Sequence, residues 1–212
     1  VYDLLPEDKI HWSYDEFLEF CRAARENGKD KNIYATQLFA GSKSSDAVYY
    51  SFMMSGGSDI LNADHTGMAI NEEKASDTLT LFKTMIEEEL VPSGAATTVD
   101  NDIRPNWYSQ KLVCMFVSTG TGEAVNVKKQ IDSGDIEPFD VDIYEIPTPD
   151  GKADPHVMSW GSTGFTIFKN AGDNAKIEAS KKVIETFLEN QSYSQEVCVQ
   201  TCLLYTSPSP RD

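Results

Sequence analysis

Hydrophobic residues recur along this chain with two different spacings. Several segments place apolar side chains three and four positions apart, which predicts amphipathic helices. The expected helices cover residues 13–28, 47–54, 72–90, 102–110, 123–131 and 175–189, and another begins at residue 192. Shorter apolar or alternating runs predict strands at residues 33–39, 112–117, 141–146 and 165–168. Because strands and helices follow each other in turn, we expect an α/β protein in which helices cover a sheet.

Local signals predict where the helices begin and which faces they bury. Ser13 and Glu16 have capping-box spacing, and Trp12 can pack on Phe17 across the helix start. Asn71 and Asp46 are expected to cap two later helices. The expected inward residues are Phe17, Leu18, Cys21 and Ala24 in the first helix, Leu79, Phe82, Met85, Ile86 and Leu90 in the third, and Ile177, Val183, Ile184, Phe187 and Leu188 in the last before residue 192.

The stretch from residue 107 to 125 is the segment around which we organise the chain. Its apolar run at 112–117 ends in Ser-Thr-Gly-Thr-Gly, and a helical pattern opens at Glu123. A strand that feeds a helix N-terminus presents unpaired N–H groups, and ligands of α/β proteins bind at such strand ends. Thr119, Gly120 and Thr121 are therefore candidate ligand-binding residues. The alternative is an ordinary strand–loop–helix connection.

Composition restricts the classes of partner. The chain has 212 residues, of which 40% are hydrophobic and 25% charged, and its formal net charge is −16. This charge argues against nucleic acid and anionic membrane surfaces as partners. No apolar run approaches the roughly 18 residues of a membrane span. Outside the last eleven residues the cysteines are Cys21, Cys114 and Cys198, whose apolar surroundings predict buried free thiols.

No catalytic or metal-binding motif is present. The three histidines are far apart and lack metal-ligand spacing, there is no P-loop or nucleophile elbow, and Gly120 and Gly122 lack a third glycine at dinucleotide-binding spacing. We therefore expect no metal, no cofactor and no catalytic residues. A pair of carboxylates could still meet in space, so a carbohydrate-active hydrolase domain remains the alternative function.

Aromatic residues beside small polar ones form the remaining candidate site. Asp46 and Tyr49 lie at the start of a predicted helix, and Trp160 and Ser162 precede the strand at 165–168. Aromatic faces stack on the C–H faces of sugars while polar groups bond the hydroxyls. Core packing is the alternative for each ring, and it is the preferred interpretation for Tyr50, Phe52 and Trp107.

Several segments, in order, resemble the extracellular solute-binding proteins of ABC importers, in the sugar-binding group similar to maltodextrin-binding protein. Trp-Ser-Tyr-Asp-Glu-Phe at residues 12–17 resembles the family's W-x-E-F helix start. The remaining matches are the helix ending in Gly-Gly at 46–57, the long helix ending in Leu-Val-Pro at 71–92, the F-x-x-G-K-x-A-M-like element at 107–116, and the return segments at 162–169 and 175–190. Gln110 and Cys114 depart from the usual Gly and Ala, and residues 119–121 lack the aromatic of some sugar binders.

The resemblance implies a two-lobe, type II periplasmic-binding-protein fold of which this chain is a C-terminal part. Residues 1–155 would form most of the second lobe, and residues 156–201 would cross the hinge into the first. The implied function is capture of a sugar or similar polar solute for the permease of an ABC importer. The implied location is extracellular or periplasmic, with a possible lipid anchor outside this chain. Residues 202–212 resemble the translated end of a sequencing adapter, and we exclude them from the fold.

Overall fold

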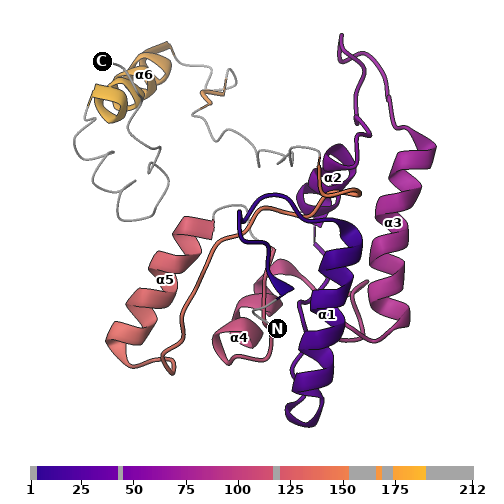
Figure 1. The fold of residues 1–212 in the computed structure, drawn as a ribbon. Coiled ribbons are helices and arrows are strands. Elements are labelled where there is room, and N and C mark those ends of the chain that lie inside the picture. The colour runs from indigo at the N-terminus through magenta and orange to yellow at the C-terminus, as the bar shows by residue number, and fades with distance from the viewer. Residues whose placement is uncertain (1–3, 43–44, 117–119, 153–165, 169–173, 190–212) are drawn as a thin grey trace, which may run out of the picture. The chain divides into compact units, whose positions relative to one another are not determined.

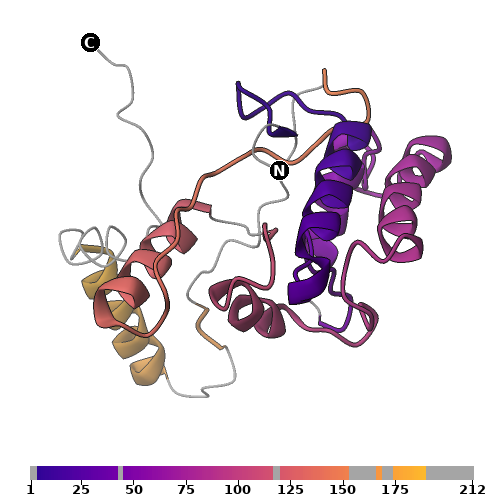
Figure 2. The same ribbon diagram turned by 60° about the horizontal axis from the view of Figure 1, so that its bottom comes forward.

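The computed structural model describes residues 4–42, 45–116, 120–152, 166–168 and 174–189 (Figures 1 and 2). Its helices are α1 (Tyr14–Gly28), η2 (Lys29–Lys31), α2 (Ser45–Ser55), α3 (Glu72–Glu87), η3 (Asp100–Asp102), α4 (Ile103–Tyr108), α5 (Gly120–Ser133) and α6 (Asn174–Glu189). The chain divides into two compact units, one of Val1–Ser118 with Lys129–Trp160 and one of Thr119–Lys128 with Gly161–Asp212. The expected assignment of residues 1–155 and 156–201 to two lobes stays a prediction.

Helix α1 begins as its sequence predicts. The Ser13 side chain accepts a hydrogen bond from the Glu16 backbone N–H, and the Glu16 carboxylate accepts one from the Ser13 backbone N–H. The Trp12 and Phe17 rings lie 5.3 Å apart, edge to face, so they form the expected hydrophobic staple across the cap. The predicted inward face is confirmed, because Phe17, Leu18, Cys21 and Ala24 are all buried.

Helix α3 presents a different face to the core from the one that its large apolar residues predict. Asn71 caps the helix by accepting from the Lys74 N–H, as expected. However, Leu79 and Ile86 are exposed, and the helix ends at Glu87 rather than at residue 90. The residues that α3 buries are Ala75, Thr78, Leu81, Phe82 and Met85. Small residues at 75 and 78 let α1 and α2 approach α3 closely, and this contact decides which side faces inward.

The core of the first unit is a cluster of aromatic rings. Phe52 of α2 is fully buried, and its ring lies 5.1 Å from both Phe82 and Phe116 in edge-to-face contacts. Phe17 of α1 lies 6.0 Å from Phe116. The cluster therefore joins α1, α2 and α3 to the extended segment that ends at residue 116. Burial of Phe52 and Trp107 confirms the core assignment of these two aromatics.

The described residues of the segments predicted as strands form no ladder, and the pairing among them is limited to isolated bridges. Tyr34 and Leu112 pair in a parallel bridge, and Ser13 pairs with Thr148 and Asp150. A regular parallel ladder uses alternate residues, whereas here consecutive N–H groups, those of Val113 and Cys114, both donate to the Ala35 carbonyl. The register is thus interrupted after one bridge. The described part of the chain contains helices and bridges but no regular strand, so the α/β two-lobe architecture stays a prediction.

The described residues of the second unit are mainly helical. Part of α5 belongs to this unit, and there Val127 is buried. Val183, Phe187 and Leu188 of α6 are exposed, so the prediction that they face a core is wrong. Ile177 and Ile184 are half-buried. Residues 166–168 carry no strand, and the other residues of the predicted return segment at 162–169 lie outside the described part.

Candidate functional site

The first group of candidate residues lies at the start of α2. The helix follows residues 33–42, of which Ala40 and Gly41 donate backbone hydrogen bonds to residues 95 and 98. Asp46 is the second residue of the helix and is exposed, so its predicted role as the N-cap is wrong. A carboxylate in the first turn is still favoured, because it interacts with the positive end of the helix dipole. Asp46 therefore presents two acceptor oxygens at an accessible helix start.

Tyr49, one turn later on α2, makes contacts typical of a packing residue. Its hydroxyl donates to the Phe39 carbonyl oxygen at 3.0 Å, and its ring meets Phe82 edge to face at 5.0 Å. Burial raises the pKa of the Tyr49 hydroxyl. The side chain is half-buried, and its polar end is already engaged within the protein. The role of Tyr49 in ligand binding stays a prediction. Only the exposed part of its ring is accessible to a ligand.

The second group lies at the start of α5. The helix begins at Gly120, three residues earlier than the predicted start at Glu123, so Gly120 and Thr121 belong to its first turn. The first N–H groups of an α-helix have no partner within the helix, and they favour an anion or a hydroxyl oxygen. In the chain this helix start follows closely on residues 112–116, the extended segment bridged to Tyr34. The strand-end ligand site that the sequence predicts at this point stays a prediction.

Glu123 is a residue that the sequence interpretation did not select. It lies in the first turn of α5 and is 4% exposed. The helix dipole stabilises a carboxylate at this position. The available signal was an acidic residue just after a glycine-containing loop, but an acidic first turn is common to many helices. Only its burial distinguishes Glu123 from a solvated residue.

The remaining candidates lie outside the described residues. These are Thr119, Trp160 and Ser162. Among the others, the structure brings Asp46 and Tyr49 together on α2, and Gly120 and Thr121 together on α5.

The described cysteines do not provide reactive thiolates. Burial raises the pKa of Cys21 well above its ordinary value and that of Cys114 to about 12. A thiol reacts as its thiolate, so both groups remain protonated near neutral pH. Cys21 and Cys114 are free, in agreement with the expectation of unpaired thiols, and Cys198 lies outside the described residues.

The first unit also contains an open groove of about 320 Å³. It runs between the end of α4 and the segment after α5, and the contact between the Trp107 and Phe139 rings at 5.4 Å holds the two walls together. The lining residues are Pro105, Tyr108, Ser109, Gln110, Asp135, Ile136 and Glu137. Among the described candidates, none of Asp46, Tyr49, Gly120 and Thr121 is one of these lining residues.

Comparisons with known proteins place the chain in a family. None of the helices in the described residues is both long enough and apolar enough to cross a membrane. Comparison with the curated proteins finds no match. The family model for the bacterial extracellular solute-binding protein matches residues 1–193, which is most of the chain. The chain therefore belongs to the bacterial extracellular solute-binding proteins, a family that binds small molecules outside the cytoplasm for transport.

Proposed function

We propose that this protein binds a sugar or an oligosaccharide in a cleft between two lobes and delivers it to the permease of an ABC importer. Family membership supplies the coarser part of this function, which is binding of a small solute in the periplasm or outside the cell. The ligand class, the cleft and the importer are the proposal. What supports the ligand class is the chemistry of the candidate residues.

The observation that carries the proposal is the start of α5 at Gly120, a few residues after the bridged segment 112–116. A helix start after an extended segment offers several N–H donors with a fixed direction. A sugar presents many hydroxyl oxygens that accept such bonds, and it leaves no charge to neutralise. Binding is favourable only when every buried hydroxyl finds a partner.

Each candidate residue has a distinct proposed role. Thr119, Gly120 and Thr121 would donate from the start of α5, and Asp46 would accept from ligand hydroxyls. Trp160 would stack on a sugar ring, with Ser162 as a nearby polar partner. Tyr49 would contribute only the edge of its ring, because its hydroxyl is bonded to Phe39.

Such a protein needs no chemical step. Two lobes that close around the solute by a hinge motion would remove it from water and present a closed form to the importer. The free energy of binding would come from burial of the aromatic faces and from satisfied hydrogen bonds. Hydrolysis would require a positioned pair of carboxylates, and no such pair is among the candidate residues.

The test uses the full-length protein with a panel of mono- and oligosaccharides. We expect one or a few sugars to raise the melting temperature, to bind in a calorimetric titration, and to be recovered intact by chromatography after a day. Trp160→Ala should weaken binding by about 1–3 kcal/mol and leave the melting temperature of the free protein nearly unchanged.

Three results would contradict the proposal. A loss of about 3–5 kcal/mol of stability in Trp160→Ala would identify Trp160 as a core residue. Release of monosaccharide would favour a hydrolase. Binding of charged solutes in place of sugars would leave the solute-binding function standing and overturn the ligand class.

A further inference from the structure

A hairpin between α2 and α3 exposes apolar side chains. Residues 58–71, here called the 58–71 hairpin, fold back on themselves. The Leu61–Met68 pair forms an antiparallel bridge, the Asn62 N–H donates to the Gly67 carbonyl at 3.0 Å, and the Ala69 N–H donates to the Ile60 carbonyl at 3.1 Å. In Figure 1 this segment projects beyond the N-terminal end of α3. The hairpin is therefore a prominent surface feature of its unit.

Polar side chains hold the hairpin at both ends. At the tip, the Asn62 side-chain oxygen accepts from the Thr66 and Gly67 N–H groups, and Asp64 accepts from the Thr66 hydroxyl at 2.7 Å. At the base, the Asn71 N–H donates to the Ser58 hydroxyl at 2.9 Å. Hydrogen bonds within the hairpin therefore hold its conformation while Leu61 and Met68 remain exposed. A surface ordered before binding loses less conformational entropy when a partner binds.

Three large apolar residues of the hairpin are exposed. Leu61 is 47% exposed, Met68 is 65% exposed and Ile70 is 38% exposed. Residues that form an antiparallel bridge lie directly opposite each other with their side chains on one face, so Leu61 and Met68 make one continuous patch. Scattered exposed apolar residues are ordinary, but a contiguous patch on a rigid projection is typical of an interaction surface.

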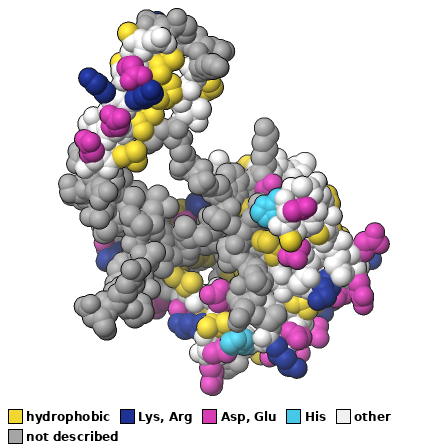
Figure 3. All heavy atoms as spheres, turned by 90° about the horizontal axis from the view of Figure 1, so that it is seen from above, with side chains coloured by type: hydrophobic (Ala, Val, Ile, Leu, Met, Phe, Trp, Pro, Cys, Tyr) yellow, Lys and Arg dark blue, Asp and Glu magenta, His cyan; other side chains and the backbone are white. Residues whose placement is uncertain are grey.

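Four exposed carboxylates, here called the rim, lie within the hairpin or in the first turn of α3 that follows it, and Lys74 is the next residue along the helix. Asp59, Asp64, Glu72 and Glu73 are exposed, and no Lys or Arg occurs between residues 58 and 73. Hydrogen bonds from the Thr66 hydroxyl and backbone N–H hold the pKa of Asp64 below its usual range. Figure 3, seen from the end of the molecule where the hairpin projects, shows hydrophobic side chains beside acidic ones.

The charge of the rim selects among possible partners. A second copy of this chain would bring carboxylates against carboxylates, and the net charge of −16 adds to that repulsion. An anionic lipid surface would repel the rim in the same way. A protein surface with an apolar socket between Lys and Arg side chains complements both the patch and the rim.

We propose that the 58–71 hairpin docks on the membrane permease that receives the solute, with Leu61 and Met68 in an apolar socket flanked by basic residues. This inference rests on the proposed function, which requires a permease as partner. Apolar contact from the patch would slow dissociation, and the acidic rim would speed association and make it sensitive to salt.

The experiment uses the full-length protein and its cognate importer reconstituted in nanodiscs. The double variant Leu61→Ser/Met68→Ser is compared with Ile86→Ser, which changes an equally exposed residue about 20 Å further along α3. The measurement is the concentration of binding protein that gives half-maximal stimulation of ATP hydrolysis by the importer. We expect this concentration to be at least tenfold higher for the double variant than for the wild type. Ile86→Ser should match the wild type, and all three proteins should bind the solute with the same Kd.

A second variant tests the rim. Glu72→Lys/Glu73→Lys should weaken the stimulation of ATP hydrolysis at low salt. At high salt its difference from the wild type should be smaller, because screening removes the charge contribution. Unchanged stimulation by the double apolar variant, or an equal loss in Ile86→Ser, would overturn the docking surface and leave solute delivery intact. Absence of stimulation by the wild type would overturn the proposed function, and the docking surface with it.

Discussion

The indole nitrogen of Trp12 donates a hydrogen bond to the Glu145 carbonyl oxygen at 2.9 Å, across a sequence separation of 133 residues. Two backbone bonds run beside it, from the Glu145 N–H to the Lys9 carbonyl and from the Thr148 N–H to the Trp12 carbonyl. The segment before α1 is thereby joined to the extended segment near residue 145. The Trp12 side chain therefore makes this connection and also forms the hydrophobic staple of α1 with Phe17.

Replacement of Trp12 by Phe should therefore cost more than the change in ring size suggests. The ring would still pack on Phe17, but the Glu145 carbonyl would lose its donor. We expect the free energy of unfolding to fall by about 1–3 kcal/mol, measured by urea denaturation. Trp12→Ala, which also removes the ring, should cost about 3–5 kcal/mol. Equal effects of the two variants would show that the hydrogen bond contributes little.

The capping box of α1 provides a second prediction. Ser13→Ala removes the acceptor of the Glu16 N–H and should lower the free energy of unfolding by about 1 kcal/mol. A matched control is Ser76→Ala, at an exposed interior position of α3, which should be neutral or slightly stabilising. The two melting curves can be compared directly by circular dichroism, and a destabilised control would point to a general effect of losing serine.

Gly28 is required because another residue closely approaches its α-carbon. A β-carbon at this position would lie 2.6 Å from the Ile33 β-carbon, although the backbone conformation of Gly28 suits any residue. Gly28→Ala should therefore destabilise the protein by about 1–3 kcal/mol through overpacking. Gly67→Ala, where the nearest atom is at 3.5 Å, should change stability by no more than about 0.5 kcal/mol. Equal denaturation midpoints for both variants would contradict this explanation.

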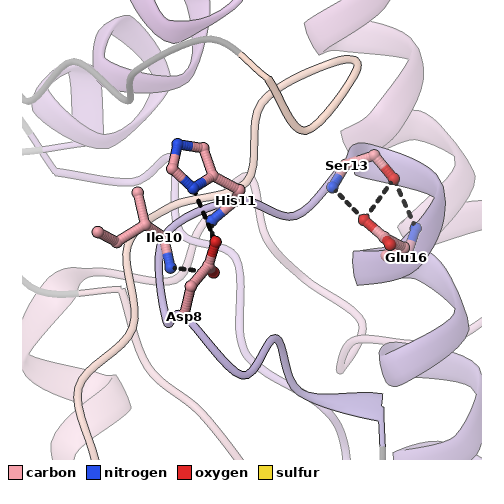
Figure 4. Close-up of polar contacts among 5 residues, drawn as sticks. All are labelled: Asp8, Ile10, His11, Ser13 and Glu16. Carbon is pink, nitrogen blue, oxygen red and sulfur yellow. Dashed lines mark hydrogen bonds and ion pairs between the residues drawn. The ribbon is translucent and has the colours of Figure 1, made fainter.

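Acid stability should depend on Asp8. Its carboxylate accepts from the Ile10 and His11 N–H groups and contacts the His11 ring at 2.7 Å (Figure 4). These bonds lower the pKa of Asp8 from 3.8 to about 2. Because the folded protein holds this proton less tightly than the unfolded chain, the stabilisation is complete above pH 4 and is lost as the pH falls through 2.

The Asp8→Asn variant checks this contribution. Wild-type protein should be more stable than the variant at pH 6, and the difference should shrink between pH 4 and pH 2. Urea midpoints at several pH values measure it, and an NMR titration of the Asp8 carboxyl gives its pKa directly. A difference that stays constant down to pH 2 would exclude Asp8 as the titrating group.

Helix starts were predictable because their causes are local. The Ser13–Glu16 box and the Asn71 cap each involve residues three apart, so the same bonds form whatever surrounds them. The start of α5 was predicted less well, at Glu123 instead of Gly120. For the candidate site, local information placed the starts of α2 and α5 to within a few residues, but it gave Asp46 the wrong role as N-cap.

Tertiary structure decided which side chains face the core and which face solvent. Thr78 is buried and Leu79 exposed, against their hydrophobicity, because the Tyr14 hydroxyl lies 3.0 Å from that of Thr78 and satisfies it in the core. Tyr49 turns toward Phe82 for a similar reason, since the Phe39 carbonyl provides its hydroxyl with an acceptor. Such partners lie from ten to more than sixty residues away in sequence. The sequence by itself determines which segments become helices and, to within a few residues, where they begin, whereas packing between distant segments determines which of their residues face the core.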